Sequence, residues 1–232
     1  MPAAADLPIP NRVLAALPRK EYQRLAGEFE PVALVFGDRL YEPGGSMRHA
    51  YFPGNSVVSL ISQIGPGKAA EVGLVGHEGM IGVPMALGIG NSPLLAVVQG
   101  TGTALRIKAA KFRKLCEMPG LQREMFRFTH LLMSQVAQTA ACNRFHVVDE
   151  RLARWLLMTY DRVQSNEFKL THEFLGHMLG VRRVAVTQSA TALQKQKLIS
   201  YSRGNITIED RKGLEARACS CYGVVKKLYG HA

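Results

Sequence analysis

Short apolar runs alternate with turn residues in the first half of the chain. Fourteen of the 22 glycines lie between Gly37 and Gly102, where they separate apolar stretches such as VALVFG, HAYFPGNSVVSLI and LLAVVQGTGTALRI. Many short strands joined by glycine and proline turns are typical of a β-sandwich or barrel. The pattern also predicts a short helix before these strands, at residues 19–29.

The spacing becomes helical from Leu121 onward. Apolar residues then recur at every third or fourth position, and they form one predicted stripe: Leu121, Met125, Phe128, Leu132, Val136 and Ala140. Residues 128–143 contain no Asp, Glu, Lys or Arg, so a helix here must be covered on more than one side. We expect the β-domain on one side and the same helix of a second subunit on the other, with the two subunits paired along the Leu121–Ala140 stripe. A core helix within a single subunit is the alternative.

Further helices follow along the chain. The segment VDERLARWLLMTYDRV (148–163) is acidic at its start and basic later, as a helix dipole favours, and NEFKL (166–170) reads as a connector. Thr171 is a suitable N-cap for a short helix, and Gly180 can adopt the left-handed conformation that ends it. A second helix is predicted to begin near Arg182. Short helix, glycine turn and second helix together indicate a helix-turn-helix.

The second helix of this motif has two different faces. Val186, Ala190 and Leu193 recur at i, i+4 and i+7 and form its predicted inward face. The outward face carries short or planar polar groups and one small apolar group, which suit contact with base edges in a major groove: Arg183, Val184, Thr187, Gln188 and Thr191. The following LISYSRGNITI reads as a β-hairpin with Arg203 at its tip, placed to reach a phosphate.

The charge of the chain favours a polyanionic partner. There are 29 Lys and Arg against 18 Asp and Glu, a net charge of +11, and the 35 residues from Phe174 to Ile208 contain five Lys or Arg and no acid. Phosphate contacts supply most non-specific affinity for DNA, and a carboxylate on that surface would repel the DNA backbone. An ordinary helical hairpin with a solvated basic face is the alternative.

Neither a membrane segment nor a metal site is expected. No apolar run is long enough to cross a bilayer, and MPAAADLPIP at the start lacks the features of a signal peptide, so we expect a cytoplasmic protein without a membrane partner. The four scattered cysteines are too few for a disulfide framework. Cys219 and Cys221 form a C-x-C pair in the last helix-like segment, where positions i and i+2 do not share a face. With no third and fourth ligand close by in the sequence, we expect two ordinary thiols there.

The segment from Leu170 to Ile208 resembles the winged helix-turn-helix of the Crp/Fnr family of bacterial transcription regulators, most specifically in LGVRRVAVTQSATALQKQKLI. The glycine-rich half resembles the family's jelly roll of the cyclic-nucleotide-binding type through VGLVGHEGMIG, and the long uncharged helix matches its dimerisation helix in position. The resemblance implies an α+β chain with a jelly-roll domain at 1–118, a dimerisation helix at 119–147 and a winged helix-turn-helix domain at 148–232.

The resemblance also implies which residues meet double-stranded DNA. Arg183 matches the family's base-reading arginine, whereas Val184 and Gln188 stand where the best-known member has a glutamate and a second arginine. We therefore expect a homodimer that reads a different near-palindromic operator through Arg183, Val184, Thr187 and Gln188. The expected phosphate contacts are Thr171, Arg182, Thr191 and Arg203. RNA polymerase would be a further partner if the protein activates transcription.

The sequence evidence for an effector-binding pocket is weaker than that for the DNA-binding motif. Glu78 and Gly79 keep part of the family's signature and are the candidate effector-pocket residues, but the position of its phosphate-binding arginine falls at Ser92-Pro93. Residues 69–105 contain no Lys or Arg, and burying an unpaired charge is costly. We therefore expect no gating by a cyclic nucleotide in the usual manner and no certain cofactor. An unidentified small effector, a ligand-independent regulator with a degenerate effector domain, and a haem- or redox-sensing regulator are the alternatives.

The sequence does not favour an enzyme. A jelly roll can also house a metal-dependent oxygenase, but that site needs an H-x-H pair with a nearby carboxylate, and no H-x-H occurs in the chain. G-x-S-x-G, H-E-x-x-H and the phosphate-binding G-x-x-x-x-G-K pattern are also missing. The sequence therefore predicts a DNA-binding regulator without catalytic residues.

Overall fold

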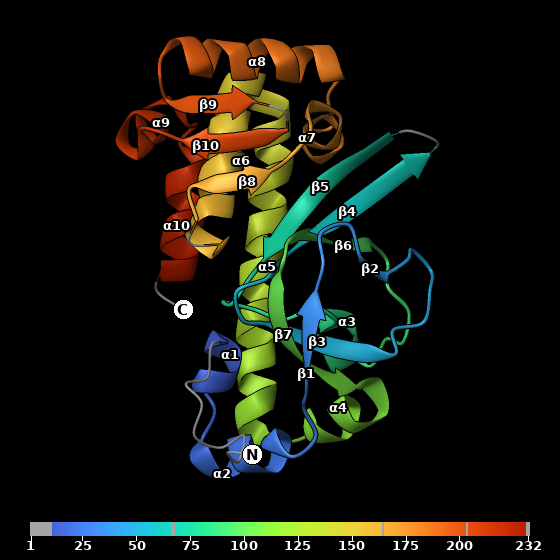
Figure 1. The fold of residues 1–232 in the computed structure, drawn as a ribbon. Coiled ribbons are helices and arrows are strands. Elements are labelled where there is room, and N and C mark those ends of the chain that lie inside the picture. Colours follow the sequence, from blue (N-terminus) through green and yellow to red (C-terminus); the bar gives the residue numbers. More distant parts are fainter. Residues whose placement is uncertain (1–10, 66–67, 164, 203, 231–232) are drawn as a thin grey trace. The chain divides into compact units, whose positions relative to one another are not determined.

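The computed structural model describes residues 11–65, 68–163, 165–202 and 204–230 (Figure 1). The chain divides into two compact units: unit 1 comprises residues 1–60 and 75–133, and unit 2 comprises residues 61–74 and 134–232. The long helix α5 (Pro119–Phe145) and the hairpin of β4 (Val57–Gly65) and β5 (Lys68–Val75) contribute residues to both units. No helix among the described residues combines the length and the apolar character needed to cross a membrane.

Unit 1 contains the glycine-rich half of the chain and consists mainly of antiparallel strands. Besides its parts of β4, β5 and α5, it is built from α1 (Arg12–Ala15), α2 (Arg19–Ala26), β1 (Glu30–Leu34), β2 (Arg39–Tyr41), β3 (His49–Pro53), α3 (Val83–Ala86), β6 (Leu95–Gly100), β7 (Gly102–Lys108) and α4 (Ala109–Leu115). One sheet has the strand order β1-β7-β3, and a second has the order β2-β6-β4-β5. The predicted β-domain of short strands is thus confirmed, and its printed strand pairs are antiparallel. The predicted N-terminal helix ends at Ala26.

Aromatic side chains fill the core of unit 1. Phe52 of β3 exposes 1% of its surface and makes edge-to-face contacts with Phe29 and Phe112, at centroid distances of 5.5 and 6.0 Å. Asn11 is fully buried, yet its polar groups are satisfied: its oxygen caps α1, and its Nδ2 donates to the backbone carbonyls of Pro53 and Gly79. A satisfied polar residue of this kind can join separate segments without the cost of an unpaired group.

Gly79 lies where a loop of unit 1 packs closely against α5. A Cβ atom built on Gly79 would stand 2.1 Å from two carbons of the Phe128 ring, far inside van der Waals contact. Phe128 itself exposes only 2% of its surface, so the ring has little room to move away. The position therefore requires glycine for reasons of space.

Replacing Gly79 by alanine is expected to lower the free energy of unfolding by about 1–3 kcal/mol, because the ring and the helix must shift within a packed core. Gly90→Ala is the matched control, since a Cβ at Gly90 meets nothing within 4 Å. Urea denaturation of both variants measures the difference. Equal stabilities would show that the loop does not pack on the Phe128 ring as described.

Helix α5 is buried along one face by its own chain. Leu121, Met125 and Phe128 expose 0%, 2% and 2% of their surface, so they belong to the core of their own subunit. A side chain that is already buried has no surface left for a partner. The structure therefore corrects the predicted partner-facing stripe over its first half, while Leu132 and Val136 are half-buried and Ala140 is exposed.

A second apolar stripe lies on the outward face of α5. Phe126 and Met133 are 54% and 66% exposed, and Ala137 and Ala140 are exposed as well. Successive spacings of seven, four and three residues place these four side chains on one side of the helix. We call Phe126, Met133, Ala137 and Ala140 the α5 stripe. Large apolar groups aligned at the surface of a helix are typical of an interaction site.

Unit 2 combines helices with a small sheet. Besides its parts of α5, β4 and β5, it is built from α6 (Val148–Val163), β8 (Glu167–Lys169), α7 (His172–Leu179), α8 (Arg183–Lys195), β9 (Ile199–Ser202), β10 (Asn205–Ile208), α9 (Arg211–Arg217) and α10 (Cys221–Gly230). Helix α6 has the predicted bounds. The predicted connector instead forms strand β8, which pairs antiparallel with β10 in a sheet of order β8-β10-β9. Only Phe168 of β8 is buried, and a three-residue strand is too short for alternation to reveal it.

Candidate nucleic-acid interface

Helices α7 and α8 meet at a glycine turn (Figure 1). Thr171 is the N-cap of α7, and its hydroxyl accepts a hydrogen bond from the Phe174 amide at 3.1 Å. Gly180 follows α7 with φ 64° and ψ 36°, a left-handed conformation that glycine adopts at little cost, and its N–H donates to the His177 carbonyl. Helix α8 then begins at Arg183. The predicted helix-turn-helix is therefore confirmed.

Helix α8 presents opposite faces to the core and to solvent. Val186, Ala190 and Leu193 expose 0%, 2% and 0% of their surface, which confirms the predicted inward face. The residues expected to meet DNA are exposed wherever the structure describes them: Thr171, Arg182, Arg183, Val184, Thr187, Gln188 and Thr191. Val184 is 66% exposed on this otherwise polar face. A small apolar side chain in such a place is suited to contact with a thymine methyl group.

An acidic residue of α6 holds α8 from behind. The Asp149 carboxylate accepts a hydrogen bond from Ser189 Oγ of α8 at 2.5 Å and one from Arg217 Nη2 of α9 at 3.4 Å. The buried Arg151, also on α6, donates to the Leu179 carbonyl at the end of α7. These contacts orient the motif on α6. These contacts leave no mark in the sequence, because only the folded chain distinguishes Asp149 from the ordinary acidic residues that begin helices.

Strands β9 and β10 form the wing of the motif. They pair antiparallel with Ser202 opposite Asn205, and Gly204 in the connecting turn has φ 83°. The hairpin predicted after the second helix is thus confirmed. Arg203, predicted at its tip as a phosphate contact, lies outside the described residues.

His172 connects α7 to α8 and to the wing. Its Nδ1 lies 2.9 Å from Thr187 Oγ1, and its ring stacks on Tyr201 of β9 with centroids 4.2 Å apart. Burial lowers the pKa of His172, and the positive charge of Arg183 lowers it further. The imidazole is therefore neutral at physiological pH, and it packs between α8 and β9 as an uncharged side chain. No sequence pattern indicates this role, since His172 is one of seven histidines and belongs to no motif.

The two threonine hydroxyls on α8 are already engaged within the helix. Thr187 Oγ1 donates to the Arg183 carbonyl at 3.1 Å, and Thr191 Oγ1 donates to the Thr187 carbonyl at 2.8 Å. A hydroxyl has one proton, and phosphate oxygens only accept hydrogen bonds. Thr191 must therefore release its helix bond before it can donate to a phosphate, whereas both threonine methyl groups stay available for apolar contact.

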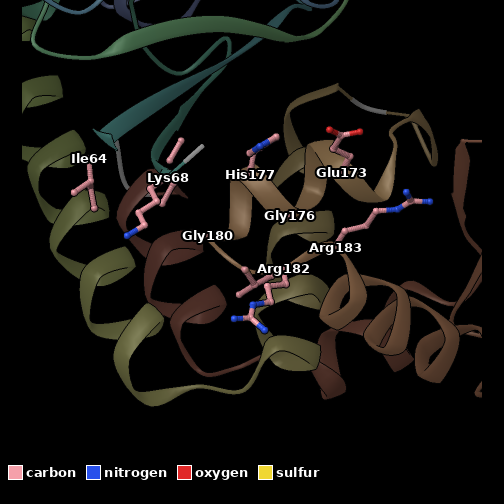
Figure 2. Close-up of a pocket in the computed structure, with 11 residues that line it drawn as sticks. Ile64, Lys68, Glu173, Gly176, His177, Gly180, Arg182 and Arg183 are labelled. Carbon is pink, nitrogen blue, oxygen red and sulfur yellow. The ribbon is translucent and has the colours of Figure 1, made fainter. Parts of the chain in front are cut away.

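A pocket of about 620 Å³ lies beside the start of α8 (Figure 2). Its lining residues all belong to unit 2, with Ile64 and Lys68 from the β4–β5 hairpin on one side and Glu173 and Arg183 on the other. The hairpin comes close to the glycine turn, since a Cβ on Gly180 would meet the Ala70 Cβ at 3.2 Å. Arg182 lines the pocket as well. The pocket is predominantly basic, because Lys68, Arg182 and Arg183 outnumber the acidic Glu173.

Solved structures share this fold over most of the chain. A Crp/Fnr-family protein from Eubacterium rectale matches with a TM-score of 0.71 and 16% identity, over 90% of this chain and 98% of its own. FixK2 from Bradyrhizobium japonicum matches with a TM-score of 0.69 and 14% identity, over 82% of this chain and 98% of its own. The c-di-GMP responsive regulator CLP from Xanthomonas campestris matches with a TM-score of 0.67 and 12% identity, over 82% of this chain and 99% of its own. At these identities the likeness establishes the fold alone. No curated protein matches the chain.

The helix-turn-helix carries a match in sequence as well as in fold. Residues 150–217, which contain α7, α8 and the wing, match the family of Crp-like helix-turn-helix domains. This part of the chain is a Crp-like helix-turn-helix domain. Helix-turn-helix domains bind DNA through their second helix, so the match identifies residues 150–217 as a DNA-binding domain.

The candidate effector residues have roles in the fold. Glu78 is 6% exposed, and both of its carboxylate oxygens lie 3.2 Å from the Gly76 amide, which donates to them. Gly79 leaves room for the Phe128 ring, as described above. Ser92 is 5% exposed, and its hydroxyl donates to a backbone carbonyl of its own loop at 2.6 Å. These contacts give each of the three residues a structural role that requires no ligand.

Proposed function

We propose that the chain is a transcription regulator of the Crp/Fnr type that binds a near-palindromic operator as a homodimer, with one α8 helix in the major groove of each half-site. The exposed face of α8 carries this proposal: Arg182, Arg183 and Gln188 project there beside the exposed Val184, and residues 174–208 contain no acid. In a symmetric dimer the two half-sites would lie about 34 Å apart, one turn of DNA.

The side chains on this face suggest which bases are read. Arginine can form two hydrogen bonds to guanine, glutamine two to adenine, and a small apolar group contacts the thymine methyl. We assign these contacts to Arg183, Gln188 and Val184 respectively. Thr187 adds its methyl group, because its hydroxyl already bonds to His172 and to the helix. Thr171, Arg182, Thr191 and Arg203 are the proposed phosphate contacts.

The α5 stripe is the proposed dimer interface. Phe126 and Met133 are large apolar side chains exposed on a long helix whose other face is buried by its own chain. Two copies of this stripe packed against each other would remove both side chains from water and place two DNA-binding domains in one particle. Ala137 and Ala140 are small enough for two helix backbones to approach closely. The interface thus keeps only Ala140 from the predicted stripe, with Val136 at its flank.

The proposed regulator is not gated by a cyclic nucleotide in the usual manner. Residues 69–105 offer no Lys or Arg for a phosphate. The next cation along the chain, Arg106, is engaged with Glu30 through two hydrogen bonds of 2.9 and 2.7 Å. A phosphate buried here would lack its counter-charge. This observation favours, as a second candidate, a dimer that binds its operator without any ligand.

Selection of bound DNA from a random duplex pool tests the proposal. The protein is first shown to be free of nucleotide and haem by its absorption spectrum and by mass spectrometry of a denatured extract. We expect recovery of a two-fold symmetric site with half-site centres about ten base pairs apart. Recovery of single half-sites would contradict the homodimer, and recovery of unrelated sequences would contradict base reading by α8.

The same protein separates the two candidate functions. Tight binding of the selected operator by ligand-free protein supports ligand independence. Binding that appears only after adding cAMP, cGMP or c-di-GMP would contradict both the absence of usual nucleotide gating and the ligand-independent regulator, while leaving the operator intact.

Arg182→Ala is expected to weaken binding to all duplexes alike, because a phosphate contact carries no sequence information. The slope of log affinity against log salt concentration should fall by about one. Lys114→Ala is the matched control, since Lys114 is an exposed cation on α4 of unit 1. A changed base preference in Arg182→Ala would place Arg182 in the groove instead.

A further inference from the structure

Four side chains with metal-binding atoms converge in unit 2. The sulfurs of Cys142, Cys219 and Cys221 and one ring nitrogen of His146 all lie within 4.8 Å of one another. Cys142 Sγ is 3.5 Å from Cys219 Sγ, and Cys221 Sγ is 3.5 Å from His146 Nδ1. The three cysteines expose 0%, 6% and 2% of their surface, and His146 is half-buried. The cluster is therefore shielded from bulk water on its sulfur side.

Local structure explains how residues 77 positions apart come together. Cys142 is in the last turn of α5, and His146 lies one turn further on, since its N–H donates to the Cys142 carbonyl at 3.1 Å. Positions i and i+4 share one helical face. Cys221 is the first residue of α10, while Cys219 lies in the connection after α9. The expectation that Cys219 and Cys221 share one helix is thus wrong, and the third and fourth ligands come from the end of α5.

The spacing of these atoms fits a tetrahedral metal ion. With Zn–S bonds of about 2.3 Å and Zn–N bonds of about 2.0–2.1 Å, neighbouring ligand atoms stand about 3.8 Å apart for two sulfurs and about 3.6 Å apart for sulfur and nitrogen. Two contacts in the cluster, both 3.5 Å, are close to these edges. They are much longer than the S–S bond of about 2.05 Å in a disulfide. Ligand atoms this close together suit one ion rather than a multi-iron cluster.

The electrostatic surroundings favour a negatively charged centre. Arg154 of α6 is 6% exposed, and its Nε and Nη1 have no hydrogen-bond partner among the described residues. Its positive charge acts on Cys142 and Cys219, and that of Arg151 acts on the same two sulfurs. A buried cation is costly unless an anion compensates it. Three neutral thiols would supply no such charge, whereas three thiolates around a divalent ion leave one net negative charge.

A neighbouring side chain supports the thiolate form as well. Gln138 of α5 donates from Nε2 to Cys221 Sγ at 3.0 Å. A hydrogen bond from an amide to a ligating sulfur holds that sulfur in place and stabilises its negative charge. Cys221 also begins a ten-residue helix, whose N-terminal end favours an anion. Both effects act on the same sulfur.

We propose that Cys142, His146, Cys219 and Cys221 bind one Zn²⁺ ion. Thiolate and imidazole ligands in tetrahedral arrangement select zinc, and four protein ligands leave no open position, as in structural rather than catalytic sites. The ion would tie the end of α5 to the α9–α10 connection, within the unit that carries the DNA-binding helix. The proposal does not depend on the operator or on the dimer.

Metal analysis of the purified full-length chain tests the proposal directly. The protein is prepared without a metal-binding tag and under a reductant that does not chelate. Elemental mass spectrometry is expected to find about one zinc per chain, falling to less than about a tenth in Cys142→Ser and in Cys219→Ser. His146→Gln provides a third variant at the half-buried edge of the site, where loss of folding is least expected. Cys116→Ser is the matched control, because Cys116 lies in unit 1, and it should keep its zinc.

Cobalt provides a second readout that needs no variant. Zinc is removed from the wild-type protein with a chelator, and Co²⁺ is added in its place. Visible absorption bands of tetrahedral cobalt with thiolate charge transfer are expected, saturating at about one equivalent. Thermal unfolding should shift downward on zinc removal and return on re-addition, because binding energy is folding energy at such a site.

Three results would overturn the proposal. Wild-type protein that contains no metal and takes up neither Zn²⁺ nor Co²⁺ would refute it. So would a Cys142–Cys219 disulfide in the freshly isolated protein, which would make the pair a thiol switch. Zinc retained in both serine variants would place the ion elsewhere. Operator binding is measured on the same preparations, so a metal-free protein that binds DNA contradicts only the zinc site, and a zinc-loaded protein that ignores DNA contradicts only the proposed function.

Discussion

Met133→Asp is expected to convert the dimer into monomers and to weaken operator binding by about 100-fold or more, because two linked half-site contacts become two independent ones. Met133 is 66% exposed at the centre of the α5 stripe, so a carboxylate there costs the isolated subunit little. In the dimer the same carboxylate would be buried against apolar groups and against its own copy. Sedimentation velocity gives the mass of the particle, and titration of labelled operator gives the affinity.

The control for this variant is Ile89→Asp. Ile89 is 53% exposed in a loop of unit 1, so the change adds the same charge to another exposed apolar position. It should leave the dimer and the operator affinity unchanged. If Met133→Asp still sediments as a dimer, the interface lies outside the α5 stripe. Leu132→Asp then becomes the informative variant, since Leu132 is half-buried at the border of the two faces.

Arg183→Ala and Gln188→Ala are each expected to cost about 1–3 kcal/mol of operator binding and to relax the preference at one base pair per half-site. Both side chains are exposed on the outer face of α8, and neither belongs to the buried set that holds the helix in place. The loss should therefore appear in affinity and sequence preference rather than in stability. Competition binding against operators with single base changes identifies the base pair that each residue reads.

Gln196→Ala is the appropriate comparison for these two variants. Gln196 is exposed and polar like Gln188, but it is the C-cap of α8, at the opposite end from Arg183. It should keep both the affinity and the sequence preference. A uniform loss across all sequences in Arg183→Ala would reassign Arg183 to the phosphates, and unchanged binding in Gln188→Ala would remove Gln188 from the base-reading set.

The zinc site and the DNA-binding face share one supporting helix. Asp149 and Arg151 on α6 orient α8 and the end of α7, and Arg154 on the same helix acts on the cysteine cluster. Loss of zinc is therefore expected to loosen the support of the recognition helix before it changes any DNA contact. This order separates the metal variants from Arg183→Ala, since only the latter should alter base preference.

Local patterns predicted the helix-turn-helix well. Thr171 as N-cap, Gly180 in the left-handed turn and Val186 on the inward face each follow from the chemistry of a few neighbouring residues. The bounds of α6 followed from its apolar spacing and from the acidic residues at its start. These features depend on interactions within a turn or two of helix, so a single sequence is enough to show them.

The covered face of α5, strand β8 and the contacts of His172 could not be predicted from the sequence, and the reason is again physical. Residues of α5 repeat with helical spacing on both of its apolar faces, and spacing alone does not show which face the subunit covers itself. Strand β8 has one inward residue, Phe168, and acquires its identity only by pairing with β10. The contacts of His172 with Thr187 and Tyr201 join segments that no local motif connects.

The sequence by itself determined the β-domain, the long helix and the helix-turn-helix, because these rest on periodicity, turn chemistry, charge and a long motif. Only the tertiary structure decided that Leu121, Met125 and Phe128 are core, which leaves Met133 and its neighbours for a partner. It also brought Cys142 and His146 to Cys219 and Cys221. The reason is the same in both cases: burial and convergence are properties of contacts distant in the chain, and no spacing along one segment encodes them.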